Sequence, residues 1–121
     1  MRSAILALIA ALAASAHAAH SDYYRVRTAA ELIGVCSTQP SEADYATAIA
    51  FCHGVLAGAY GYYIASTPPA DRFVCPPDPP PTRSQVAQRF VAWGKSRPEL
   101  MSEGAIDTLF RYAAEAMPCK R

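Results

Sequence analysis

The hydrophobic pattern of the chain centres on residues 45–65, which contain no acidic or basic side chain apart from His53. Large side chains recur there at helical spacing and predict one face of an α-helix, formed by Tyr45, Ile49, Cys52, Leu56 and Tyr63. Small side chains form a second stripe, at Thr47, Ala50, Gly54, Gly58, Gly61 and Ala65. Glycine inside a helix costs about 1 kcal/mol relative to alanine, so we expect neighbouring backbones to pack closely on this stripe. The pattern therefore predicts a buried central helix, in which Gly58→Leu would overpack the core.

A membrane span is the alternative interpretation of this segment, because about 20 uncharged residues are enough to cross a bilayer. Its few strongly apolar side chains would each favour insertion by only about 0.3 to 0.6 kcal/mol. His53, the glycines and the tyrosines oppose insertion. We therefore favour a buried helix of a soluble domain, without a membrane span.

Two capping boxes mark the starts of shorter helices on either side of the central segment. Thr28 with Glu31, and Thr82 with Gln85, place a hydroxyl and a longer polar side chain where each can satisfy a free backbone amide. The first of these helices is expected to end near residue 36, and the other before residue 98. The inward side chains of the latter are expected to be Val86, Phe90 and Trp93.

The remaining segments are predicted from proline positions and helical spacing. Ser41 is expected to cap the central helix. Prolines at positions 76, 77, 79, 80 and 81 predict a stiff loop over residues 71–81. A fourth helix is expected over residues 102–117, with an inward face formed by Ile106, Leu109, Phe110, Ala113 and Met117. Period-two alternation is not found, so the predicted fold is all-α, a small four-helix domain around the central helix.

The N-terminal segment has the pattern of a secretory signal peptide. Arg2 precedes an apolar run, and Ala16-His17-Ala18 provides a small-x-small cleavage signal. Residues 1–18 are therefore predicted to be removed on export. Residues 19–121 then form one domain, because a chain of this length supports a single core.

Charge and residue spacing argue against several classes of function. The formal net charge is +1 and the basic residues are dispersed, so the chain has no electrostatic footprint for nucleic acid or an anionic membrane. His53 follows Cys52, but adjacent helical residues point about 100° apart and do not face each other as a nucleophile and its base would. The acidic residues are also dispersed, without the spacing of a metal-binding loop. We expect neither an enzyme nor a metal or cofactor site.

Four cysteines in an exported chain favour two disulfides, although the sequence alone leaves three pairings open. If the third and fourth helices form an antiparallel hairpin, Cys75 just before one lies beside Cys119 just after the other. The connector over residues 37–41 is long enough for Cys36 to reach Cys52. In the loop-entropy model these two closures contribute about 4 and about 3 kcal/mol, respectively.

An ordered set of motifs resembles the Rap/Tai family of immunity proteins over nearly the whole mature chain. The motifs are Thr28-Ala-Ala-Glu-Leu32 to Cys36, Phe51-Cys52-His-Gly54-Val55 to Gly58, Phe73-Val-Cys75-Pro76, Thr82-x-x-Gln85-Val86, Arg97-Pro98-Glu99-Leu100 and Met117-Pro118-Cys119. The resemblance implies a small helical periplasmic protein that neutralises a peptidoglycan-cleaving amidase effector of type VI secretion. It also implies that the protein forms a homodimer, as members of that family often do.

An HdeA-like periplasmic acid-stress chaperone is the alternative function, because such proteins share this size, compartment and use of disulfides. For an immunity protein, we expect the stiff loop and its ends to contact the effector, since a proline-rich loop loses little conformational entropy on binding. Phenylalanine and arginine at the loop ends are also common interface residues. The predicted contacts are Arg72, Phe73 and Arg83, together with Tyr60 and Tyr62.

Overall fold

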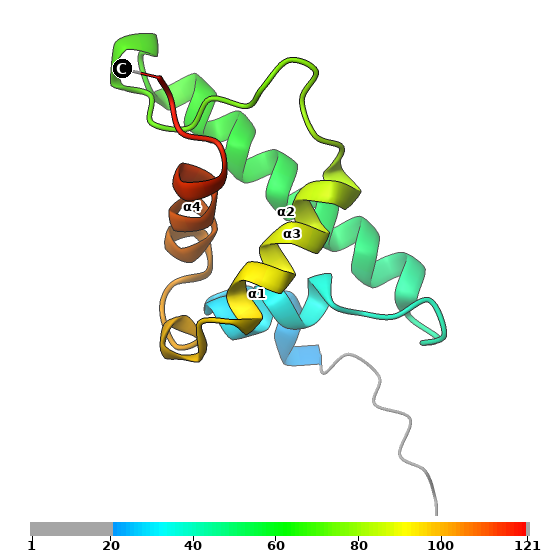
Figure 1. Ribbon diagram of the computed structural model, residues 1–121. Coiled ribbons are helices and arrows are strands. Elements are labelled where there is room, and N and C mark those ends of the chain that lie inside the picture. Colours follow the sequence, from blue (N-terminus) through cyan, green and yellow to red (C-terminus); the bar gives the residue numbers. More distant parts are fainter. Residues whose placement is uncertain (1–20, 121) are drawn as a thin grey trace, which may run out of the picture.

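A computed structural model describes residues 21–120, and Figure 1 shows how its helices are arranged. The α-helices are α1 (Ala29–Cys36), α2 (Tyr45–Ser66), α3 (Arg83–Lys95) and α4 (Ala105–Ala116). Residues 21–120 also form three short 3₁₀ helices that the sequence pattern did not predict, η1 (Ser21–Arg25), η2 (Pro69–Asp71) and η3 (Pro98–Leu100). No strand is formed within residues 21–120, and the predicted all-α, four-helix fold is confirmed. The predicted signal peptide, residues 1–18, lies outside the described residues.

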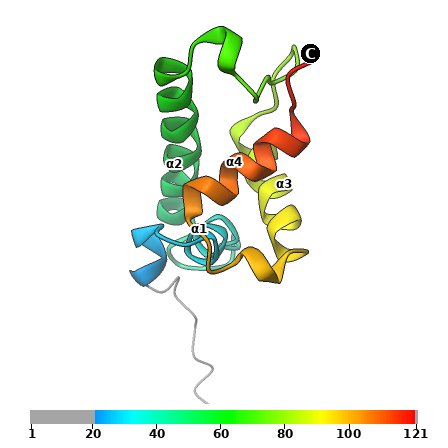
Figure 2. The same ribbon diagram turned by 90° about the vertical axis from the view of Figure 1, so that its left-hand side faces the viewer.

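The longest helix, α2, runs along one side of the molecule, and α3 and α4 lie beside it (Figure 2). At one end of the molecule, α1 contacts each of the other three α-helices. The segment that follows α4 returns to the far end of α2, near η2 (Figure 1). The proline-rich segment leads from this end to the start of α3 (Figure 1). The second half of α2 therefore lies near both this segment and the segment that follows α4.

Both predicted capping boxes are present. The Thr28 hydroxyl accepts from the Glu31 amide at 3.3 Å, and the Glu31 carboxylate accepts from the Thr28 amide at 3.2 Å. Thr82 and Gln85 repeat this exchange at 3.1 and 2.9 Å. Desolvation of Glu31 raises its pKa, but hydrogen bonds from the Arg27 and Thr28 amides and the Arg27 charge outweigh that effect, so the pKa of Glu31 is lowered. Local side-chain chemistry thus fixes where α1 and α3 begin.

Two predicted helix starts were wrong. Ser41 lies in a turn, and the N-cap residue of α2 is Asp44, whose carboxylate accepts from the Tyr24 hydroxyl at 3.3 Å instead of capping the helix. The start of α4 is Ala105 rather than near residue 102. The Ala105 amide donates to the Arg27 carbonyl at 3.0 Å, and this long-range bond, invisible in the local sequence, sets the start of the helix.

Two disulfides hold the helices together, in the pairing that helix geometry favoured. Cys36, at the end of α1, is bonded to Cys52 in α2, with Cα atoms 5.2 Å apart. Cys75, before α3, is bonded to Cys119, after α4, with Cα atoms 4.8 Å apart. The disulfide at Cys52 is buried in the core, whereas Cys75 is exposed.

The core is formed by one face of each α-helix. Leu32 and Val35 of α1 and Phe90 of α3 are fully buried. The buried face of α4 consists of Ala105, Thr108, Leu109, Tyr112 and Ala113. The predicted inward position of Ile106 was wrong, because the buried face starts one residue earlier at Ala105 and leaves Ile106 41% exposed.

A half-buried tryptophan joins the end of α3 to α4. Trp93 stacks on Phe90, with ring centroids 6.4 Å apart, and its indole nitrogen donates to the Glu115 carboxylate at 2.8 Å. The Arg97 guanidinium lies 4.3 Å from the centroid of the Trp93 ring and also donates to Glu115, at 3.0 Å. Trp93 and Val86 were both predicted to face inward. Both pack against the core, but each side chain is only partly buried.

The central helix is buried along one face only, which corrects the expectation of a fully buried helix. Its buried residues are Ala48, Cys52, Leu56 and Tyr63. The stripe of small residues is exposed, and a side chain added at Gly54, Gly58 or Gly61 would meet no atom within 4 Å. The disulfide at Cys52 and the packing of Tyr63 hold the face with these buried residues against the domain, so the small residues face outward. By length and a hydropathy of 1.3, α2 also qualifies as a candidate membrane span, a test that core helices of soluble proteins pass as well.

We predict that alanine has opposite effects at two helical glycines. Gly58→Ala should raise the free energy of unfolding by up to about 1 kcal/mol, because the site is exposed and alanine favours the helix. Gly94→Ala should lower it by about 1 to 3 kcal/mol, because the new methyl group would overlap the buried Ile33 side chain. Urea denaturation of both variants beside the wild type measures the difference. Equal destabilisation would mean that Gly58 is covered within the folded chain.

Candidate binding groove

The second half of α2 is attached to the domain through Tyr63. The buried Tyr63 hydroxyl accepts from the backbone amides of Phe73 and Val74, at 2.7 and 3.0 Å. The Tyr63 ring packs against Phe73 and Phe110, with both centroid distances 5.1 Å. Tyr63 therefore connects α2 both to the segment before α3 and to α4.

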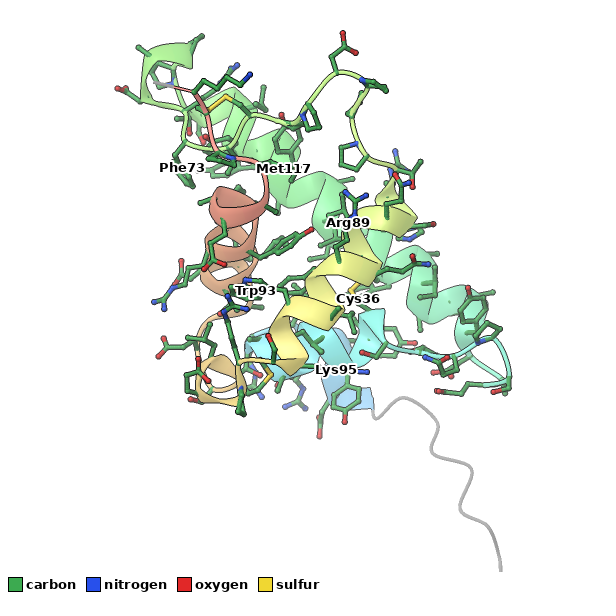
Figure 3. The ribbon with its side chains drawn as sticks, in the orientation of Figure 1. Cys36, Phe73, Arg89, Trp93, Lys95 and Met117 are labelled. Carbon is green, nitrogen blue, oxygen red and sulfur yellow. A yellow bond between two sulfur atoms is a disulfide. The ribbon has the colours of Figure 1, made fainter. Side chains whose placement is uncertain are left out.

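The segment that follows α2 is held firmly before the proline-rich loop begins. The Arg72 guanidinium donates to the carbonyl oxygens of Ile64 and Thr67, both at 3.2 Å, and so caps the end of α2. The Cys75 amide donates to the Met117 carbonyl at 2.8 Å. Figure 3 shows Phe73 and Met117 near one another, where the chain before α3 meets the chain after α4. The loop over residues 76–81 thus starts at a disulfide and ends at a capping box.

A groove of about 290 Å³ lies between α2, the proline-rich loop, α3 and α4. Its walls are almost entirely apolar. The lining residues are Leu56, Ala57, Tyr60 and Gly61 of α2, Val74, Pro76, Pro80 and Pro81 of the loop segment, Arg83 and Val86 of α3, and Leu109, Phe110, Tyr112, Ala113 and Met117 of α4. Along α2 these positions fall between Cys52 and Tyr63, where the helix is attached. The groove is therefore the space left between two fixed points of one straight helix.

Few polar groups reach this groove. Among the residues that the structure describes, Arg83 is the one charged residue that lines it, and Tyr112 contributes a phenol. Burial raises the pKa of the Tyr112 phenol, while the positive charge of Arg89 acts in the opposite direction. The Tyr112 hydroxyl is thus a neutral hydrogen-bond donor at neutral pH, with an arginine near it. Figure 3 shows Arg89 on α3.

The structure brings together some of the predicted contact residues and separates others. Tyr60 and Arg83 line the groove. Phe73 is 49% exposed at its edge and packs on Phe110, one of the lining residues. The Arg72 side chain is occupied by its bonds to α2, and Tyr62 is 76% exposed but does not line the groove.

The wall that α4 contributes was not singled out from the sequence. Tyr112 and Leu109 follow the helical spacing of an ordinary core face, and nothing local distinguishes a side chain that lines a groove from one that fills a core. As for catalytic chemistry, Cys52 is oxidised in a disulfide and provides no thiol beside His53. Within the described part of the chain, no three His, Cys, Asp or Glu side chains gather as a metal site would require.

These features define a class of protein, a small disulfide-bonded helical domain that presents an apolar surface groove. A family model for Rap1a immunity proteins matches residues 28–119, and the chain belongs to this family. Searches of curated proteins and of solved structures gave no significant match. The matched segment begins at the capping residue Thr28 and ends at Cys119, so it contains both disulfides and every wall of the groove. The family assignment confirms the resemblance seen in the motifs.

Arg72 and Arg83 should differ in what they do for stability. Arg72→Met removes two hydrogen bonds to the end of α2 and should lower the free energy of unfolding by about 1 to 2 kcal/mol. Arg83→Met removes an exposed charge without an ion pair among the described residues, and should change it by less than about 0.5 kcal/mol. Urea denaturation of the two variants checks this. A loss in Arg72→Met as small as the change expected for Arg83→Met would show that Arg72 does not support the helix end.

Proposed function

We propose that this protein is an exported, periplasmic immunity protein that binds and inhibits a peptidoglycan-cleaving amidase effector of type VI secretion. The observation that carries the proposal is the Rap1a immunity family match over residues 28–119. Immunity to a secreted effector requires binding to a protein, and the domain offers an apolar groove beside a rigid loop for that purpose. The two disulfides support export, because such bonds persist in oxidising compartments.

The proposed contact surface is the edge of the groove together with the proline-rich loop. Phe73 and Tyr60 expose 49% and 37% of their surface there, and aromatic residues of this kind often dominate protein interfaces. Arg83 follows the loop directly and is available to pair with a carboxylate of the partner. Because Cys75 and Thr82 fix its two ends, the loop can form these contacts with little loss of conformational entropy.

Inhibition of an amidase is the direct test. The mature protein should form a complex with an amidase effector, sought first among the products of the genes beside its own, and should stop that enzyme from cleaving purified peptidoglycan at equimolar ratio. A pull-down from periplasmic extract provides an independent route to the same partner. If the protein neither binds nor inhibits the amidase, the proposal is refuted. If the tertiary packing of the protein instead loosens at low pH and exposes apolar surface, the acid-stress chaperone alternative is favoured.

The loop itself should contribute to affinity. Replacing residues 77–81 by a Gly/Ser segment should leave the helical circular dichroism unchanged and weaken effector binding by about tenfold or more, which is about 1.4 kcal/mol. The added flexibility and the loss of the loop contacts both act in that direction. A Gly/Ser replacement of residues 39–43, in the turn before α2, is the matched control and should bind as the wild type does. Unchanged binding by the folded loop variant would make the loop a simple connector.

We also propose that the protein forms a homodimer through the exposed face of α2. No charged side chain interrupts this face, and the small residues at Ala50, Gly54 and Gly58 leave room for a second helix to approach closely. Light scattering on a size-exclusion column should therefore give twice the monomer mass. Gly58→Arg should give a monomer, whereas Ala92→Arg on the exposed side of α3 should not. If the wild type is a monomer at high concentration, the homodimer proposal is wrong, but the proposed immunity function is unaffected.

A further inference from the structure

The most informative group in the groove is the Tyr112 hydroxyl. Tyr112 is 4% exposed, it lines the groove, and its hydroxyl makes no hydrogen bond within residues 21–120. The other buried tyrosine of the core, Tyr63, has a hydroxyl that accepts two backbone amides. Within the described residues, the fully buried polar side-chain atoms without a partner are Asp44 Oδ1 and Thr108 Oγ1. The Tyr112 hydroxyl is not one of them, so it opens onto the groove, where a ligand can reach it as a hydrogen-bond donor.

The charges around the groove select the kind of partner. Arg83 lines it, and the charge of Arg89 acts on the Tyr112 phenol. Among the described residues, Arg25, Arg27 and Arg97 have carboxylate partners, whereas Arg83 and Arg89 have none. No acidic side chain from residues 21–120 lines the groove. Two unpaired cations and a neutral hydroxyl donor favour a carboxylate, which accepts hydrogen bonds and carries negative charge.

The rest of the groove selects an apolar body of limited size. A cavity of about 150 Å³ is enough to hold a benzene molecule, so about 290 Å³ holds one aromatic or branched aliphatic side chain with its neighbouring atoms. The apolar surface also continues from Tyr60, which lines the groove, to Phe73 at its edge, and both side chains are partly exposed. The groove is therefore the deepest part of a wider surface, as expected for a protein segment with one anchoring side chain.

We propose that the groove binds one apolar side chain of the effector together with a carboxylate next to it, and that Tyr112 and Arg83 hold that carboxylate. This inference rests on the proposed function, because it takes the effector as the source of the segment. The carboxylate is that of an Asp or Glu side chain adjacent to the anchor, or of the chain terminus. The anchor fills the space between Leu56 and Leu109, and the proline-rich loop closes one side.

The chemistry of the groove can be tested without the effector, with 4-phenylbutyrate as a probe. In ¹H–¹⁵N spectra of the whole mature protein, the probe should shift groove residues saturably, with a Kd of about 1 mM as its size suggests. The uncharged 4-phenyl-1-butanol should bind about tenfold more weakly. Equal binding of the alcohol, or shifts that do not saturate or do not map to the groove, would overturn the carboxylate assignment.

Two conservative variants assign the carboxylate to its residues. Tyr112→Phe removes a hydroxyl that no protein group uses, so the fold should persist while probe binding weakens about three- to tenfold. Arg83→Gln should weaken it by a similar factor. Tyr45→Phe and Arg111→Gln, which do not line the groove, are the matched controls and should bind the probe as the wild type does. Unchanged affinity in Tyr112→Phe and Arg83→Gln would remove these residues from the site.

The source of the segment is tested with the effector itself. Ala57→Trp places a large side chain over the groove and should abolish probe binding and weaken the effector complex at least tenfold, whereas Ala92→Trp on α3 should affect neither. If the wild type binds the effector and Ala57→Trp binds it equally well, the effector does not use the groove and the inference fails alone. If the wild type binds no effector, the proposed function fails, and this choice of occupant fails with it.

Discussion

The structure depends on how one long helix is attached at two separated points. Near its middle, α2 is bonded through Cys52 to the end of α1, and near its end the Tyr63 hydroxyl and ring hold it to the segment before α3 and to α4. The residues of α2 that line the groove, Leu56, Ala57, Tyr60 and Gly61, all lie between these two attachments. The groove thus lies beside a stretch of helix that is held at both ends.

This arrangement suits a protein that must recognise another protein. The groove walls come from α2, α3, α4 and the loop, and each of these is fixed by a disulfide, a capping box or buried packing. A surface that is already ordered before binding loses little entropy when the partner arrives, so a modest area can still give useful affinity. The apolar walls supply contact area. The Tyr112 hydroxyl and the two arginines supply specificity, because they favour a negatively charged hydrogen-bond acceptor at one position.

Much of the fold is determined by local chemistry and could be predicted from the sequence. The two capping boxes, at Thr28 and Thr82, act over three residues and placed their helices correctly. The sequence left three disulfide pairings open, but the lengths of the last two helices and the reach of the connector before α2 favoured the pairing that the structure has. The rotation of α2 could not be predicted, because its two faces differ in side-chain size rather than polarity, and tertiary attachments at Cys52 and Tyr63 decide which face is buried. For the groove, Arg83 and Tyr60 were predicted from residue type, but Tyr112 becomes notable only when its hydroxyl is seen to lack a partner.

The second disulfide has a consequence for the lifetime of the protein. Because Cys75 is bonded to Cys119, the chain from the loop to the end of α4 forms a closed covalent ring. A protease that cuts once inside this ring, for example at an exposed position of the loop, produces two pieces that stay joined by the disulfide and by the packing of α3 and α4 on the core. The domain can thus be cut once within this ring without being taken apart.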